Sequence, residues 1–132
     1  MLPSYHFSKS LPKGVHFEEA VVRATEALKS EGFGVLTEID VAATLKKKID
    51  VNFRPYRILG ACNPQFAYQA LQSEDKIGTM LPCNVVVQQH DDGTIEVSAI
   101  DPVASMMAVQ NNSLGSVATE VQARLKRVID SL

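Results

Sequence analysis

Cysteine is scarce in this chain, and long hydrophobic runs are absent. The two cysteines among 132 residues, Cys62 and Cys83, are too few for the disulfide framework of a small secreted domain. No segment reaches the roughly 18 consecutive apolar residues that a membrane-spanning helix needs. The start of the chain, Met1 to His6, lacks the basic residues and the apolar stretch of a signal peptide. We therefore expect a soluble cytoplasmic protein with no membrane partner.

An excess of charge of one sign is also missing. The formal net charge is −2 at pH 7, so no basic field attracts nucleic acid, and we expect no nucleic-acid partner. The densest basic run, Lys46 to Lys48, is typical of a solvated helix face. Apolar side chains make up 45% of the 132 residues, which predicts a single domain, 1–132, whose core folds without disulfides or metal.

The sequence lacks the patterns that mark the common enzyme classes. It has no Gly-rich phosphate loop, no assignable Ser-His-Asp order and no paired carboxylates beside a predicted cleft. His6 and His90 are isolated in the sequence, and two cysteines without a histidine motif fall short of a closed zinc site. The sequence therefore predicts neither a cofactor nor a metal site.

Apolar periodicity predicts a long helix near the start of the chain. From Phe17 to Glu31 the apolar residues recur at intervals of four, three and four, which places them on one helical face. Gly32 is well placed as a left-handed C-terminal cap, with Phe33 folding back on Leu28.

The rest of the chain alternates between strand and helix patterns. Five strands are predicted at Tyr5–Ser10, Phe33–Ile39, Asn52–Cys62, Leu81–Gln89 and Thr94–Ile100. Three further helices are predicted at Val41–Lys48, Pro64–Ser73 and Leu114–Ser131, with N-caps at Asp40, Asn63 and Ser113 and with a loop at Asp101–Asn112. This pattern favours an α+β fold in which helices pack on one face of an antiparallel-rich sheet of about five strands.

The best candidate site combines two strand ends. Cys62 ends one predicted strand and Cys83 begins a later one, so antiparallel pairing would bring the thiols together. Cys62 also precedes the helix that starts at Asn63, where backbone amides favour a thiolate. Arg57 and Asn84 are candidate polar partners. Free cysteine is also a common core residue, so a structural role for both remains an alternative.

Two adjacent methionines are the other candidate binding residues. Met106 and Met107 lie in the predicted loop after the last strand. Flexible thioether side chains can cover an apolar pocket, so this loop is a candidate lid. The alternative is that the pair fills the core.

Four segments together resemble a known family. They are EGFGVLTEIDV at 31–41, FRPYRILGACNP at 53–64, LPCNVVV at 81–87 and IEVSAIDP at 95–102. They resemble the bacterial and archaeal domain-of-unknown-function 302 family. The resemblance implies a β-α-β(4)-α fold similar to the TATA-binding-protein half-repeat, and a homodimer, but no established activity. Exposed sheet edges also favour association.

Three functions follow as hypotheses. The first is a dimeric domain that binds a small ligand between the sheet and the helices. The second is a thiol-dependent redox or sulfur-handling protein that uses Cys62 and Cys83. The third is a structural or partner-binding module.

Overall fold

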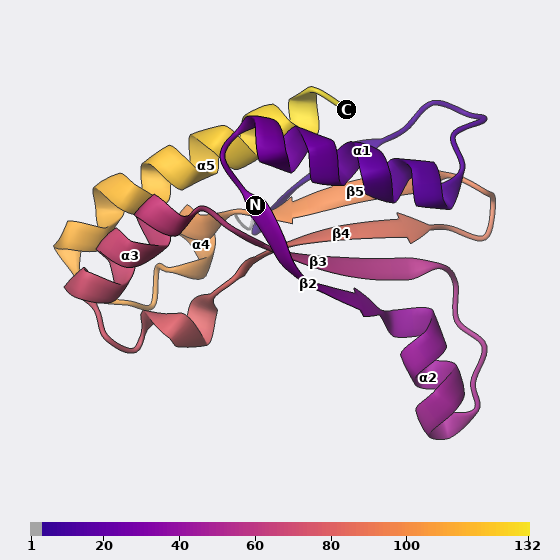
Figure 1. The fold of residues 1–132 in the computed structure, drawn as a ribbon, viewed down its shortest axis with the longest axis horizontal. Coiled ribbons are helices and arrows are strands. Elements are labelled where there is room, and N and C mark those ends of the chain that lie inside the picture. Colours follow the sequence, from indigo (N-terminus) through magenta and orange to yellow (C-terminus); the bar gives the residue numbers. More distant parts are fainter. Residues whose placement is uncertain (1–3) are drawn as a thin grey trace.

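A computed structural model describes residues 4–132. Its elements along the chain (Figure 1) are β1 His6–Ser10, α1 Phe17–Ser30, β2 Gly34–Asp40, α2 Val41–Ile49, β3 Tyr56–Cys62, α3 Pro64–Ser73, η1 Ile77–Met80, β4 Cys83–Gln89, β5 Ile95–Ile100, α4 Pro102–Ser105, η2 Asn112–Leu114 and α5 Gly115–Asp130. No helix within residues 4–132 is long and apolar enough to span a membrane.

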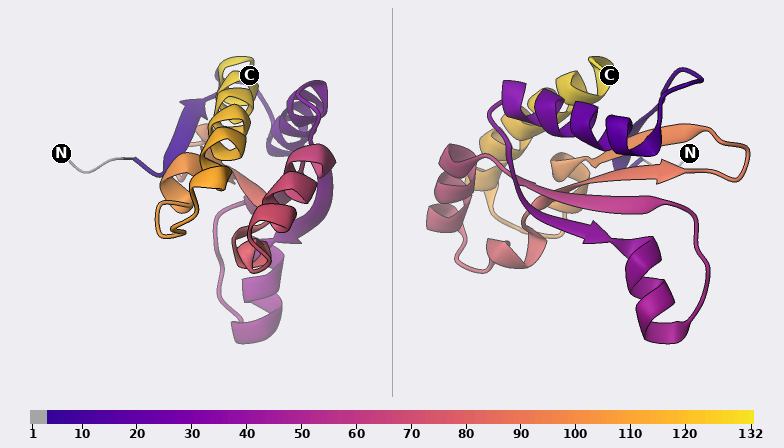
Figure 2. Two further views of the ribbon diagram at one scale, coloured as in Figure 1. Left: turned by 90° about the vertical axis from the view of Figure 1, so that its left-hand side faces the viewer. Right: turned by 45° about the vertical axis from the view of Figure 1, so that its right-hand side comes forward.

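The five strands form one antiparallel sheet in the order β1-β5-β4-β3-β2. The two long helices, α1 and α5, lie side by side on one face of it (Figures 1 and 2). The predicted α+β fold with helices on one face is therefore confirmed. Without α2, α3 and the short helices, the order is β-α-β(4)-α. Likeness to the TATA-binding-protein half-repeat stays a prediction.

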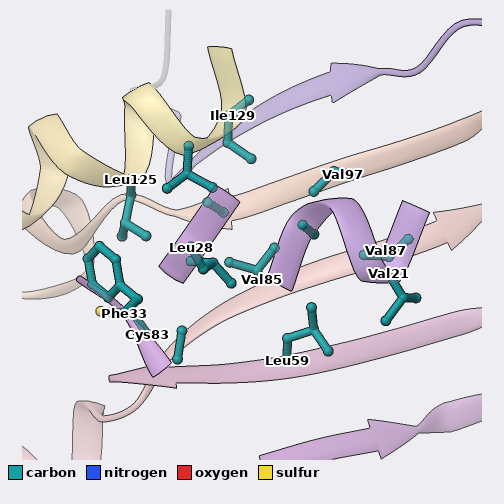
Figure 3. Close-up of a cluster of buried hydrophobic side chains, with 14 of the residues drawn as sticks. Val21, Leu28, Phe33, Leu59, Cys83, Val85, Val87, Val97, Leu125 and Ile129 are labelled. Atoms are coloured by element: carbon teal, nitrogen blue, oxygen red, sulfur yellow. The ribbon is translucent and has the colours of Figure 1, made fainter. Parts of the chain in front are cut away.

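The core lies between this sheet face and the two long helices. Alternate residues of the central strands point into it, and they meet the apolar stripes of α1 and α5 (Figure 3). Fully buried members are Leu28, Leu59, Val85, Val97 and Leu125. Phe33 and Cys83 belong to the same cluster. The core therefore reaches as far as the strand ends where the candidate cysteines lie.

The predicted end of α1 is confirmed. Gly32 has a φ of 87°, the left-handed conformation that glycine adopts without steric cost. The N–H of Phe33 donates to the carbonyl of Leu28 at 2.9 Å, and the N–H of Gly32 donates to that of Lys29 at 3.1 Å. These two hydrogen bonds form a Schellman motif, which turns the chain directly into β2.

Of the three predicted N-caps, one forms a capping hydrogen bond and two do not. Asp40 caps α2 as predicted, because its Oδ1 accepts from the N–H of Ala43 at 2.9 Å. Asn63 occupies the N-cap position of α3, but its side chain makes no capping hydrogen bond. Ser113 does not cap the last helix, which begins at Gly115 after η2. Asn111 caps the short helix η2 instead, because its Oδ1 accepts from the N–H of Ser113.

Strand β2 departs from the predicted alternation because it contains a β-bulge. Val35 pairs with Ala61, whereas Thr37 pairs with Gly60, the residue directly before Ala61 in β3. The extra residue is Leu36, whose side chain is 68% exposed. A bulge moves every later side chain to the other face, so the simple two-residue period across 33–39 is wrong.

Another segment differs from the prediction. The predicted loop Asp101–Asn112 contains the short helix α4, which Asp101 caps through the N–H groups of Val103 and Ala104. Helix α2 leaves the sheet edge as a projecting arm (Figure 1), and none of its side chains is buried.

Candidate functional site

A cavity of about 270 Å³ lies at the end of the sheet, between the strand ends of β3 and β4 and the helices α3 and α5. Its lining is Phe33, Leu36, Ala61, Cys62, Asn63, Phe66, Ala67, Ala70, Leu81, Pro82, Cys83, Pro102, Met106, Val117, Ala118 and Val121. Apart from Asn63 and the two thiols, every one of these side chains is plainly apolar. Within this lining, Leu36 is an exposed side chain.

Both candidate cysteines line this cavity, as antiparallel pairing predicts. Cys83 pairs with Ala61, the residue before Cys62. Cys83 is buried and Cys62 is half-buried, and neither forms a disulfide. The structure therefore brings the two thiols to one cavity, with Cys62 the more accessible of the two.

The surroundings of Cys83 keep its thiol neutral. Burial, with a smaller effect of charge on Cys62, raises the pKa of Cys83 to about 11. Desolvation disfavours a thiolate because the surrounding apolar groups cannot solvate the anion. At neutral pH Cys83 therefore packs as a small apolar side chain in the cavity wall.

Asn63 is the one amide in the cavity lining. Its side chain is half-buried and does not cap α3. Its Nδ2 lies 2.9 Å from the point where a Cβ on Gly32 would stand. The glycine that ends α1 therefore leaves room for this amide, which is the polar group best placed to bond a ligand.

Of the two methionines, only Met106 lines the cavity. Its segment is fixed by Asp101, whose Oδ1 caps α4 and also accepts from Gln122 Nε2 at 3.0 Å. Met107 is 72% exposed and is not part of the lining. The side chain of Met106 therefore forms part of the cavity wall, whereas that of Met107 faces solvent.

Arg57 lies at the far end of β3 and does not reach the cavity. It stands five positions before Cys62, which corresponds to about 16 Å of extended strand. Its guanidinium contacts Glu18 and Glu38 at 2.7 Å each, and the hydrogen bond to Glu18 is the main cause that raises the pKa of Arg57. This residue joins α1 to the sheet edge instead of serving the candidate site.

Asn84 also falls outside the cavity, although it follows Cys83 directly. Successive strand residues point to opposite faces, and Asn84 borders two other hollows instead. One of them lies on the sheet face opposite α1 and α5, beside Tyr56 and Val86. Asn84 is therefore not part of the lining that Cys62 and Cys83 share, although it borders a neighbouring hollow with Cys83.

Sequence reasoning missed most of the cavity wall. The missed residues are Phe33, Leu36, Ala61, Phe66, Ala67, Ala70, Leu81, Pro82, Pro102, Val117, Ala118 and Val121. Val117 and Val121 were visible as part of the apolar stripe of the last helix. Phe66 and Ala70 share the same four-residue spacing.

Within residues 4–132 no group of three or more His, Cys, Asp or Glu side chains is arranged to hold a metal ion.

The comparisons with known proteins agree with this fold. Residues 7–132 match the family described as "Domain of unknown function DUF302". A crystal structure of an uncharacterized conserved DUF302 protein from Bacillus stearothermophilus is 31% identical, with a TM-score of 0.88 over 97% of this chain and 98% of that one. No curated protein matches the chain. The chain belongs to the DUF302 family.

Proposed function

We propose that this protein binds a small apolar ligand in the cavity between the end of the sheet, α3 and α5. The observation that carries the proposal is the lining, in which one amide and two thiols interrupt an otherwise apolar wall. Ligand sites are typically concave and apolar, with a few polar groups that orient the ligand.

The volume limits the size of the ligand. An apolar cavity of about 150 Å³ stays dry and takes up benzene. At the same packing, a cavity of about 270 Å³ holds roughly ten non-hydrogen atoms. The proposed ligand is therefore a short aliphatic chain or a substituted ring.

Native mass spectrometry of freshly purified protein tests this proposal, with 1-octanol added as a probe. Ala67→Phe should fill the cavity at its half-buried wall and reduce the bound fraction. Gln69→Phe, on the exposed side of the same helix, is the matched control and should bind as the parent does. If neither a retained ligand nor 1-octanol is detected on the parent protein, the proposal is wrong.

A thiol-dependent function is the second candidate, because both cysteines line one cavity. Cys62 is half-buried, so a small reagent can reach it, whereas Cys83 is buried and neutral. In this function Cys62 would be the nucleophile, and the apolar wall would exclude water from the sulfur species it carries. Mass spectrometry of the same samples detects this function as a covalent adduct on Cys62.

We also propose that the protein is a homodimer, and the α2 arm supports this. A nine-residue helix is too short to be stable without a packing partner, yet no side chain of α2 is buried. Exposed apolar residues run along the same edge: Leu36, Ile39, Ile49, Val51 and Phe53. A second copy packed on this edge would cover them. Sedimentation at micromolar concentrations reports the oligomeric state directly.

A further inference from the structure

We infer that the ligand carries an anionic head group, a carboxylate in its simplest form, at one end of its apolar body. This inference rests on the binding function proposed above and adds the chemical class of the ligand. It depends on Arg124, which the sequence did not mark as a candidate.

Arg124 lies at the rim of the cavity. It follows Val121, a lining residue, by one turn of α5. Its Cζ lies 5.1 Å from the ring centroid of Phe66, another lining residue. A Cβ placed on Gly32 would stand 3.5 Å from Arg124 Nη1 and 2.9 Å from Asn63 Nδ2. The guanidinium and the amide therefore flank the same small space beside the cavity.

The guanidinium has donor capacity left. Its Nη1 donates to the carbonyl of Glu31 at 3.1 Å, and its Nε donates to Glu120 Oε1 at 3.1 Å. No hydrogen bond from Nη2 is found within residues 4–132. The carboxylate of Glu31 is paired with Arg127 at 2.9 Å. It is therefore engaged away from Arg124 and does not take up the free donor.

These contacts favour an acidic head group over a neutral or basic one. The guanidinium and the Asn63 amide both offer N–H donors, and a charge-assisted hydrogen bond from arginine to a carboxylate is stronger than a neutral one. The cavity itself cannot hold a charge, because its apolar walls leave an ion unsolvated. The chain must therefore lie inside while the carboxylate stays at the rim, with the Arg124 side chain 31% exposed.

Isothermal titration calorimetry with three probes of equal chain length tests the inference: octanoate, 1-octanol and octylamine at pH 7.5. The affinity for octanoate should be at least about five-fold higher than that for 1-octanol, because one partly exposed charged contact adds a difference of that order. Octylamine should bind most weakly. Raising the salt concentration to 1 M should reduce the preference for octanoate.

Arg124→Gln should abolish the preference for octanoate, because it weakens the binding of octanoate more than that of 1-octanol. Arg124→Lys should restore part of it, and a melting curve of each variant checks its folding. Lys126→Gln, which removes an exposed cation from the same helix, is the matched control and should keep the preference. Equal binding of octanoate and 1-octanol, or a preference that survives Arg124→Gln, overturns the inference but leaves the proposed function intact. Failure of all three probes to bind overturns both.

Discussion

Cys62 and Cys83 lie on neighbouring antiparallel strands and line one apolar cavity, yet their surroundings differ. Cys83 is buried, and that burial raises its pKa to about 11. Cys62 is half-buried at the end of β3, next to Asn63. The chemical difference between two nearby thiols is thus produced by position in the fold, and it leads to the first two predictions.

Alkylation of the native protein should modify Cys62 before Cys83. Only a thiolate reacts rapidly, and at pH 8 Cys83 is almost entirely neutral and out of reach. Peptide mapping after timed exposure to iodoacetamide measures both rates. In denaturant the two rates should become similar. Equal, slow labelling of both residues in the native protein would make them ordinary core residues and would remove the thiol-dependent function.

Stability should fall at alkaline pH because of Cys83. Its pKa is raised on folding, so the native state holds this proton more tightly than the unfolded chain does. The contribution is complete below a pH of about 9, the ordinary pKa of a thiol, and is lost as the pH rises toward about 11. The loss should be on the order of 2–3 kcal/mol.

Urea titrations between pH 7 and pH 11 measure this loss. Other groups titrate in the same range, so the comparison is between variants. Cys83→Ala should show a smaller alkaline decrease in the free energy of unfolding than Cys62→Ala. Parallel curves for the two variants would show that Cys83 is not the group responsible.

Gly32→Ala should destabilise the protein by about 1–2 kcal/mol from backbone strain alone. Its φ is 87°, and the added Cβ would also stand 2.9 Å from Asn63 Nδ2. Gly115→Ala is the control, because this glycine is helical and a Cβ there meets nothing within 4 Å. The control should be neutral or slightly stabilising. Urea denaturation that ranks the two variants in the opposite order would contradict the assigned conformations.

Ile49→Asp should shift the protein toward monomer. Ile49 is 63% exposed on the α2 arm, and an aspartate there would place a charge in the proposed dimer contact. Val22→Asp is the control, because Val22 is a 54% exposed apolar residue on α1. Sedimentation velocity should give a smaller species for Ile49→Asp only. A parent protein that is monomeric at micromolar concentrations would remove the dimer proposal.

Local features were predictable because their hydrogen bonds join residues close in sequence. The left-handed Gly32 and the Asp40 cap both depend on partners within five positions. The bulge at Leu36 was not predictable in this way. Leu36 is out of phase with the apolar residues on either side of it, but only the pairing with β3 shows that it is the extra residue.

The candidate site was only partly predictable, because some of it also depends on contacts between residues far apart in the sequence. Antiparallel pairing correctly placed Cys62 and Cys83 together, and Asn63 and Met106 line the same cavity. Of the two predicted polar partners, Arg57 lies at the other end of its strand and Asn84 points to the opposite face of the sheet. The contribution of α5, including Arg124, depends on which helix covers the end of the sheet. That is a tertiary property without a local signal.

Methyl-resolved NMR during titration with 1-octanol tests the apolar binding site most directly. The proposed function predicts saturable shifts for the methyl groups of Val117, Val121 and Ala70, which line the cavity. The methyl groups of Ile58 and Val86, which pair with each other away from the cavity lining, should stay unchanged. Shifts confined to Ile58 and Val86, or no saturable shift at the cavity residues, would contradict the account.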